Sequence, residues 1–355
     1  MLSLHTACDR GQRLTAMQRR RGLKLIVVAV ALVVIGAAAL VQWYRAATRP
    51  VATSGEPVLV EIERGSGASV IARQLEAAGL IRSAAAFEVL LSLSGEAGSL
   101  RAGQYELSPE MDAAQIARKL AAGEVAVRRV TIPEGLRIEE IAERIAEAGL
   151  TSADEFLEAA TPSQVMEQSR PDGLKLDGDS LEGYLFPETY DFELGSEPSA
   201  MAARMVRELN ERFVKPNKQR IAASKLSLHE IITLASLVER EARVAQERPP
   251  IAGVLMNRLN RDMPLQCDAT IQYALGAHRE RLLYEDLKVD SPYNTYLHKG
   301  LPPGPICAPG LESLLAALSP AETDSLYYVA RPDGKHVFSK TYEEHQAAIR
   351  RVRSQ

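Results

Sequence analysis

Cysteine is scarce in this sequence, which has Cys8, Cys267 and Cys307 among its 355 residues. Three cysteines are too few for the disulfide framework of a small secreted scaffold. The composition, 46% hydrophobic and 25% charged, is that of a globular protein with a buried core, and the length predicts more than one domain. Intrinsic disorder is therefore excluded as the main property of the chain.

Basic charge is also lacking outside the N-terminus. Six of the 42 Lys and Arg residues, but only one of the 46 Asp and Glu residues, fall in the first 24 positions, so the remainder carries a net charge of −9. Proteins that bind nucleic acid at physiological salt depend on clustered basic side chains. We therefore expect no nucleic-acid partner.

The common metal and cofactor motifs are absent. His229 and Glu230 begin an HExxH-like pattern, but Thr233 stands where the second zinc-binding histidine belongs. No dinucleotide fingerprint, phosphate-binding loop or Gly-x-Ser-x-Gly nucleophile motif occurs in the sequence. We therefore expect neither a metal ion nor an organic cofactor.

One long hydrophobic run is present, from Leu25 to Val41, and Trp43 and Tyr44 follow it. As a helix this run covers about 25 Å, close to the thickness of a bilayer core, and the flanking aromatic residues suit the interface. We predict a cytoplasmic basic tail at 1–24 and a transmembrane helix at 25–44, with the remainder outside the cytoplasmic membrane. The alternative is a cleaved signal peptide with an Ala-x-Ala site at Ala37 and Ala39.

A linker and an internal repeat follow the hydrophobic run. Residues 45–57 contain Pro50, Pro57 and a Ser-Gly pair and show no periodicity, which predicts a linker. Beyond them, a short extended run, a Gly turn and an amphipathic helix occur twice, which predicts a strand-helix unit that is used more than once. Ile62, Gly65, Ile71, Ala72, Ala78, Gly79 and Leu80 recur 70 positions later as Ile132, Gly135, Ile141, Ala142, Ala148, Gly149 and Leu150.

A buried helix that ends in acidic residues is the first candidate for chemistry. Ser227 and Glu230 form a capping-box pattern before an apolar stretch, and Glu239 follows on the stripe of Ile232 and Ala235. A carboxyl group in apolar surroundings near a helix C-terminus favours its neutral form, as a general acid requires. The alternative is that Glu239 marks the solvated, charged end of the helix.

Two polar segments provide candidate substrate-binding residues. LQCDAT (265–270) contributes Gln266, Asp268 and Thr270, and SPYNTY (291–296) contributes Tyr293, Asn294 and Tyr296. Amides and carboxylates suit sugar hydroxyl and acetamido groups, and tyrosine faces suit sugar rings. The same residue types also occur in purely structural turns.

Five motifs follow one another along the chain: EGYLFPETY (182–190), LASLVEREA (234–242), LQCDATIQYALG (265–276), SPYNTYLHKGLPPGPICAPG (291–310) and HVFSKTYEEH (336–345). In this order they resemble the motifs of the YceG-like, or MltG-type, endolytic murein transglycosylases, and the likeness covers essentially the whole chain. The sequence departs from the family pattern at Cys267, Ala269, Cys307 and Ala308.

The resemblance implies an α+β fold with a small LysM-like domain at 58–127 and a larger catalytic domain at 128–355. It implies that Glu239 is the catalytic residue, first as acid and then as base, and that the muramoyl C6 hydroxyl closes on C1 to give a 1,6-anhydro end. It adds Glu182 and Tyr184 to the candidate substrate-binding residues. It implies a single-pass protein of the inner membrane that acts on peptidoglycan strands, with penicillin-binding synthases as candidate partners.

Two other functions remain open at this point. One is a peptidoglycan hydrolase that uses Glu239 together with Glu241 or Asp268, since ordinary glycoside hydrolysis needs two carboxylates. The other is a wall-binding scaffold without activity. Whether Cys267 and Cys307 form a disulfide also remains open, because sequence alone does not place them within bonding distance.

Overall fold

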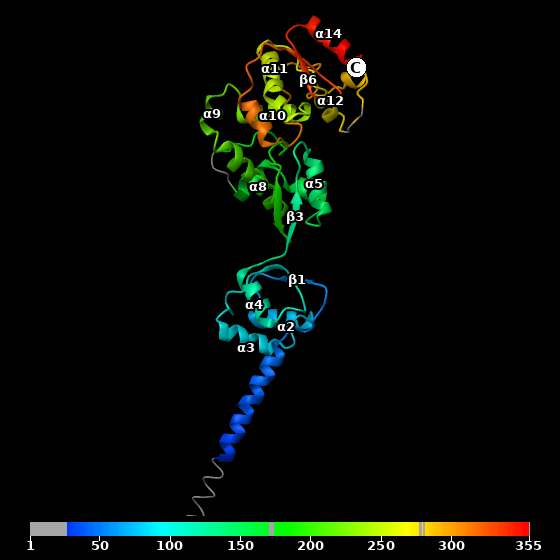
Figure 1. The fold of residues 1–355 in the computed structure, drawn as a ribbon. Coiled ribbons are helices and arrows are strands. Elements are labelled where there is room, and N and C mark those ends of the chain that lie inside the picture. The colour runs from blue at the N-terminus through cyan, green and yellow to red at the C-terminus, as the bar shows by residue number, and fades with distance from the viewer. Residues whose placement is uncertain (1–26, 170–173, 277–278, 280, 355) are drawn as a thin grey trace, which may run out of the picture. The chain divides into compact units, whose positions relative to one another are not determined.

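A computed structural model describes residues 27–169, 174–276, 279 and 281–354. The chain divides into two compact units, Met1–Ala126 and Val127–Gln355, whose elements are labelled in Figure 1. The predicted basic tail and the first two residues of the predicted membrane span lie outside the described residues. Within the described residues, both units combine helices with short antiparallel strand pairs, so the fold is mixed α+β.

An exposed apolar helix, Val27–Ala47, precedes the small unit. It has 21 residues and a mean hydropathy of 2.2 over its most apolar window, none of which is buried. A helix of this length rises about 32 Å, enough to cross a bilayer core. The helix therefore fits a single-pass membrane anchor, and it ends three residues beyond the predicted boundary at Tyr44.

The small unit has its own hydrophobic core. Strands β1 (Val58–Ile62) and β2 (Gly103–Leu107) pair antiparallel, with Val58 opposite Leu107. Three helices accompany them: α2 (Ala68–Ala77), α3 (Ala84–Ser94) and α4 (Ala113–Ala122). The core contains, among others, Ile71, Phe87, Leu91, Tyr105 and Leu120, each of which is fully or almost fully buried.

The segment predicted as a linker is hydrogen-bonded to the small unit. The N–H of Ala113 donates to the carbonyl of Thr48 at 3.1 Å, and the N–H of Ala52 donates to the carbonyl of Pro109 at 3.1 Å. The Arg82 guanidinium donates to the carbonyl of Pro50 at 2.8 Å. These bonds attach residues 48–52 to the first residue of α4 and to the loops that precede α3 and α4.

The sequence repeat is confirmed as a repeat of structure. Helix α5 (Ile138–Glu147) begins and ends 70 residues after α2, and strand β3 (Val127–Thr131) precedes it as β1 precedes α2. Gly65 and Gly135, in the turn before each helix, both have φ near +80°, a conformation that favours glycine. Each copy is followed by a second helix with a serine N-cap, α3 in the small unit and α6 (Ala153–Ala159) in the large one.

The large unit is mainly helical, with two antiparallel strand pairs. Strand β3 pairs with β4 (Thr189–Glu193), and β5 (Tyr327–Ala330) pairs with β6 (His336–Ser339). Its remaining elements are α7 (Pro162–Ser169), α8 (Pro198–Leu209), a π-helical turn (Asn210–Val214), α9 (Lys218–Ala223), α10 (Leu228–Glu241), 3₁₀ turns at Ala245–Glu247 and Asp286–Lys288, α11 (Arg248–Asn260), α12 (Asp268–Ala274), α13 (Leu311–Leu318) and α14 (Tyr342–Arg353).

Helix α10 forms the centre of the large unit's core. Its predicted capping box is confirmed: the Glu230 N–H donates to Ser227 Oγ at 3.2 Å, and the Ser227 N–H donates to Glu230 Oε2 at 2.7 Å. All eight residues from Ile231 to Val238 are buried, and α11 and α13 pack against the helix. Because burial holds this helix on all sides, the positions of the side chains at its C-terminal end are fixed.

Replacing the N-cap of α10 is expected to weaken the large unit. Ser227→Ala leaves the N3 amide without its side-chain acceptor, and we expect the free energy of unfolding to fall by about 1 kcal/mol. Chemical denaturation of the full chain measures the change. Ser99→Ala, at an exposed serine of the small unit, is the matched control and is expected to leave stability unchanged. Equal stability of the two variants would contradict the assigned role of the cap.

Candidate active site

Glu239 lies in the last turn of α10, with a side chain that is 8% exposed. Its carboxylate accepts two hydrogen bonds, one from Arg248 Nη2 at 3.2 Å and one from the Gly310 N–H at 3.0 Å. Arg248 begins α11, and Gly310 is the N-cap of α13. The side chain of Glu239 therefore connects the end of one core helix to the beginnings of two others.

Another acidic group lies beside Glu239. Glu134 Oε2 is 3.6 Å from Arg248 Nη2, and its carboxylate lies against the backbone of Gly310, where a Cβ atom would clash with it. Burial raises the pKa of Glu134, and the charge of Glu239 raises it further. The sequence led us to expect apolar surroundings for Glu239. The helix before it is apolar, but the carboxylate itself lies among charged and polar groups, because α11, α13 and the turn after β3 meet there.

Glu241, two residues further on, has a different environment. Its carboxyl group accepts hydrogen bonds from the side chain of Tyr328 in β5 and from the backbone N–H of Ala269 in α12. Burial raises the pKa of Glu241 to about 7, and the charge of Asp268 adds to the shift, while the two hydrogen bonds oppose it. Glu241 is therefore a carboxyl group that keeps its proton up to near-neutral pH.

Glu241 lines a polar cavity of about 390 Å³. Three of the predicted substrate-binding residues, Gln266, Asp268 and Tyr296, line the same cavity. Asp268 is the first residue of α12 and accepts a hydrogen bond from Tyr296 Oη at 2.5 Å. The other lining residues include Arg258, Tyr328, His336 and His345. The cavity thus combines two carboxyl groups, an amide and two tyrosines.

Gln266 reaches the cavity through an unusual backbone conformation. Its φ is +52°, in the left-handed region that non-glycine residues seldom adopt. The Gln266 N–H donates to the carbonyl of Thr295 at 3.0 Å, and Arg258 Nη1 donates to Gln266 Oε1 at 3.4 Å. Backbone strain of this kind persists where the surrounding structure enforces it, and it is frequent at functional sites.

Two other predicted residues hold the loops around this cavity. Asn294 is fully buried, and its Nδ2 donates to the carbonyls of Leu287 at 3.0 Å and Val289 at 2.9 Å. Thr270 is also fully buried, and its hydroxyl donates to the carbonyl of Cys267 at 2.7 Å. Both side chains therefore support the loop backbone, and neither is among the residues that line the cavity.

The remaining predicted residues lie outside the 390 Å³ cavity. Tyr184 is buried, with its hydroxyl 2.8 Å from His229 Nδ1, and the ring of Tyr293 lies 4.7 Å from that of Tyr273. Glu182 is 4% exposed and accepts a hydrogen bond from the Ile138 N–H at 3.3 Å, while its Oε1 is buried without a partner in the described part of the chain. Burial raises the pKa of Glu182 to about 8.

Sequence reasoning did not identify Arg258 and Tyr328 and gave Glu241 only a secondary role. Tyr328 lies in a strand of ordinary hydrophobic composition, so no local pattern distinguishes it. The motif HVFSKTYEEH contained a usable signal, since His336 and His345 at its two ends both line the cavity. For Glu241 the signal was its place in the same motif as Glu239.

Cys267 and Cys307 are separate free thiols in the structure, and both are buried. Cys267 Sγ donates to the carbonyl of Leu265 at 3.8 Å, and Cys307 Sγ donates to the carbonyl of Ser236 at 3.5 Å. Burial raises the pKa of both thiols well above the ordinary value. Both side chains therefore act as small packing groups rather than as nucleophiles.

These features define the class of protein. The site combines a carboxyl group that is protonated near neutral pH, a second carboxylate beside it and a polar cavity with two tyrosines. This combination is typical of an acid–base enzyme that acts on a polar substrate.

The comparisons with known proteins give the family. Residues 60–351 match the model of the YceG-like family, and the chain belongs to this family. An endolytic murein transglycosylase of Bacillus subtilis strain 168 is 38% identical over 302 residues, which cover 82% of this chain and 83% of that protein. One from Streptococcus pneumoniae serotype 2 is 32% identical over 327 residues, and the match spans 59% of its length.

A solved structure is also similar. The 2.6 Å crystal structure of a yceG-like protein from Listeria monocytogenes is 37% identical and has a TM-score of 0.55 to this chain. The similarity covers 83% of this chain and all of that one.

The buried Glu182 predicts a pH-dependent stability. Its pKa is raised in the folded state, so the folded chain binds the proton more tightly, and the resulting stabilisation disappears as pH rises from about 4.5 to about 8. Glu182→Gln removes this loss, and we expect the variant to be more stable at pH 8.5 by an amount on the order of 3 kcal/mol.

Thermal unfolding at pH 5.5 and 8.5 measures this effect. Glu143→Gln, an exposed glutamate of α5, is the matched control and is expected to follow the unmodified chain at both pH values. The interpretation is wrong if Glu182→Gln loses as much stability between the two pH values as the control does.

Proposed function

We propose that this chain is a membrane-anchored endolytic murein transglycosylase. It cuts the bond between N-acetylmuramic acid and N-acetylglucosamine in peptidoglycan strands and leaves 1,6-anhydromuramoyl ends. It is an enzyme of the lyase class, in keeping with its family and with relatives named endolytic murein transglycosylase. One observation of the structure carries the chemical part of the proposal: Glu241, with a pKa of about 7, faces a cavity that Gln266 and Asp268 also line.

Two carboxyl groups compete for the role of proton donor. The motif resemblance points to Glu239, whose carboxylate accepts hydrogen bonds from Arg248 and Gly310. The geometry favours Glu241, because it is the one of these two glutamates that lines the cavity and its surroundings preserve the proton that a general acid must give. We therefore assign the acid–base role to Glu241, with Glu239 as the competing assignment that the experiment below decides.

A single carboxyl group is sufficient for a lytic transglycosylase. Protonated Glu241 donates its proton to the glycosidic oxygen, and the bond to muramoyl C1 breaks. The resulting carboxylate then accepts the proton of the muramoyl C6 hydroxyl as that oxygen bonds to C1. The nucleophile belongs to the substrate, so its high effective molarity takes the place of an activated water molecule, and Glu241 ends the cycle protonated.

The other cavity residues support this reaction. Asp268, which accepts a hydrogen bond from Tyr296, is proposed to stabilise the positive charge of the oxocarbenium-like transition state. The same charge raises the pKa of Glu241. Gln266 supplies an amide for the acetamido group of the sugar. In this assignment Glu239 is a positioning residue that holds the starts of α11 and α13 against α10.

The remaining parts of the chain support a location of this site at the cell wall. We propose that the N-terminal helix anchors the chain in the inner membrane with the N-terminus in the cytoplasm, which the excess of basic residues before the helix supports. Residues 58–127 are proposed as a LysM-like domain that holds glycan, and residues 128–355 as the catalytic domain. Peptidoglycan synthases are proposed as partners, because a cleavage enzyme at the membrane works where strands are made.

Matched variants decide between the two glutamates. With purified glycan strands, the full chain is expected to produce 1,6-anhydro ends, and Glu241→Gln is expected to lower kcat by about 10²–10⁴. Glu239→Gln, on the same helix end, is expected to keep more than a tenth of the activity. Mass spectrometry of the products gives both the rate and the kind of end formed.

Each alternative has its own outcome in the same experiment. Reducing ends in place of anhydro ends would mean hydrolysis by two carboxylates, and intact strands would mean a wall-binding scaffold. If Glu239→Gln abolished cleavage while Glu241→Gln remained active, the acid–base role would belong to Glu239.

The environment of Glu241 also predicts the pH profile. The proton donor must be protonated, so kcat/KM is expected to fall as pH rises through about 7. Tyr328→Phe removes a hydrogen bond that stabilises the carboxylate, which moves the fall to higher pH by about half a unit to one unit. Asp268→Asn removes a negative neighbour and moves it to lower pH.

Tyr327→Phe, the neighbouring residue in β5, is the control for Tyr328→Phe and is expected to leave the profile in place. Shifts of the same sign in Tyr328→Phe and Asp268→Asn would show that the titrating group is not Glu241.

A further inference from the structure

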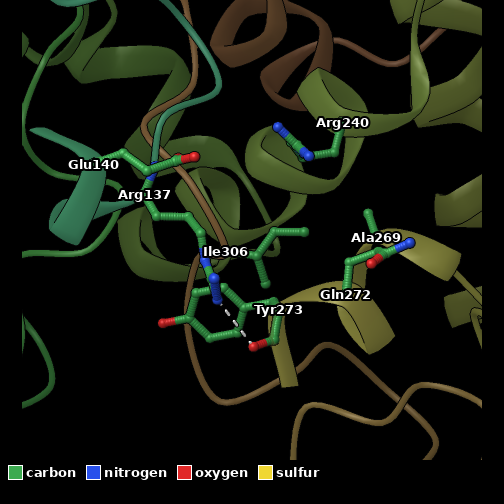
Figure 2. A pocket seen from close by; sticks show the side chains of 7 residues that line it. All are labelled: Arg137, Glu140, Arg240, Ala269, Gln272, Tyr273 and Ile306. Atoms are coloured by element: carbon green, nitrogen blue, oxygen red, sulfur yellow. Dashed lines mark hydrogen bonds between the residues drawn. The ribbon is translucent and has the colours of Figure 1, made fainter. Parts of the chain in front are cut away.

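A second pocket of the large unit contains two arginines and has no assigned role. Figure 2 shows it: Arg137, Arg240, Gln272 and Tyr273 surround Ile306, and Glu140 and Ala269 complete the lining. We call these residues the two-arginine pocket. Arg137 is the N-cap of α5, Arg240 lies in the last turn of α10, and Gln272 and Tyr273 belong to α12. Three segments far apart in the sequence thus converge on one site.

Neither guanidinium has an acidic partner within ion-pair distance among the described residues. Arg137 Nη2 donates to the carbonyl of Tyr273 at 3.2 Å, its guanidinium lies 4.9 Å from the centre of the Tyr273 ring, and its Nε is buried without a partner. Arg240 Nη1 donates to the carbonyl of Gly135 at 3.2 Å. An arginine has five N–H donors, so most donors of both side chains are left for a ligand.

The charge of the pocket favours an anion. Its one carboxylate, that of Glu140, accepts a hydrogen bond from the Arg137 backbone N–H at 2.8 Å and caps α5. Two guanidinium groups against one carboxylate leave a net positive charge. Guanidinium groups bind carboxylates through paired, charge-assisted hydrogen bonds, and the Gln272 amide and the Tyr273 ring suit an amide-bearing, partly apolar neighbour of that carboxylate.

The pocket is connected directly to the candidate catalytic carboxyl group. Arg240 lies between Glu239 and Glu241 in α10, and Ala269 lines the pocket while its backbone N–H donates to Glu241. The two-arginine pocket and the Glu241 carboxyl group therefore share Ala269 as a contact and involve adjacent residues of α10.

We propose that Arg137 and Arg240 bind a carboxylate of the muramoyl residue or its stem peptide and thereby set the register of the strand. The inference rests on the proposed function. In the alternating polymer, N-acetylglucosamine carries no carboxylate, whereas each muramoyl residue carries one on its lactyl group or on the attached peptide. A cationic site beside the catalytic carboxyl group therefore distinguishes the two kinds of glycosidic bond, which neutral sugar contacts do poorly.

Kinetics on three strand preparations test the proposal with the full-length protein. The preparations are peptide-bearing strands, strands stripped of peptide so that the lactyl carboxylate is free, and stripped strands whose carboxylates are converted to methylamides. Arg137→Gln and Arg240→Gln are each expected to raise KM about tenfold on a carboxylate-bearing preparation, with kcat changed less than threefold. On the methylamide strands, both variants are expected to match the unmodified chain.

The preparations identify the source of the carboxylate. A loss confined to the peptide-bearing strands assigns it to the stem peptide, and a loss confined to the stripped strands assigns it to the lactyl group. Arg144→Gln removes the same charge from the exposed face of α5 and is the matched control. Unchanged KM values in both pocket variants, or an equal rise on the methylamide strands, would overturn the proposal.

A binding measurement tests the two-arginine pocket independently of strand cleavage. Calorimetry is carried out with N-acetylmuramyl tripeptide and N-acetylmuramic acid, each compared with its methyl ester. The unmodified chain is expected to bind one of the acids about tenfold more tightly than its ester, and Arg240→Gln to lose that preference. Arg240 is exposed, so this variant is expected to fold even if Arg137→Gln does not.

The calorimetric outcome does not depend on cleavage. Equal binding of acids and esters by the unmodified chain would reject the pocket even if anhydro ends are formed. Preference for an acid without any cleavage would retain the pocket and reject the transglycosylase.

Discussion

The complete burial of α10 is the constraint on which the candidate site depends. Eight consecutive buried residues hold this helix in place, so its last turn has a fixed direction. Successive helical residues are about 100° apart, so Glu239 and Glu241 point to nearly opposite sides of the axis. One carboxyl group consequently meets the helix starts at Arg248 and Gly310, and the other meets the cavity wall at Tyr328 and Ala269. A small shift of the helix end would therefore weaken the contacts of both carboxyl groups without exchanging them.

Much of the scaffold was predictable because its signals are local. The capping box of Ser227 and Glu230, the apolar run after it and the 70-residue repeat each depend on residues close together in the chain, and the structure contains all three. The environment of a carboxyl group is not local. Tyr328 reaches Glu241 from 87 positions away, so the sequence identified the helix end as chemically important without giving the properties of each acid. Asn294 is a predicted binding residue because of its residue type, and the sequence did not show that its amide is hydrogen-bonded to two loop carbonyls.

The repeated strand-helix unit indicates how the large unit acquired part of its polar site. The turn between β3 and α5 carries Glu134, Gly135 and Arg137, which contact Gly310, Arg240 and Tyr273. The corresponding turn of the small unit has Arg64, Gly65 and Gly67, so the glycine that the turn conformation requires is shared and the side chains of Glu134 and Arg137 are not. The same backbone unit thus occurs in the small unit without these side chains and in the large unit with two side chains that line polar sites. Within this turn, Gly135 therefore meets the requirement of the backbone, and Glu134 and Arg137 supply the polar side chains.

The pKa of Glu241 also depends on the hydrogen bonds of Arg258, the cation that lowers it. Arg258 lines the same cavity, but its Nε donates to the carbonyl of Leu326 at 2.7 Å and its Nη1 donates to the carbonyl of Leu265 at 2.9 Å. A guanidinium committed to carbonyls lowers the pKa of a nearby carboxyl group less than burial and a neighbouring carboxylate raise it, and the pKa of Glu241 remains near 7. Were Arg258 released from these carbonyls and paired with Glu241, the carboxyl group would lose its proton at neutral pH. The loop carbonyls that hold Arg258 thus help to keep the Glu241 carboxyl group protonated near neutral pH.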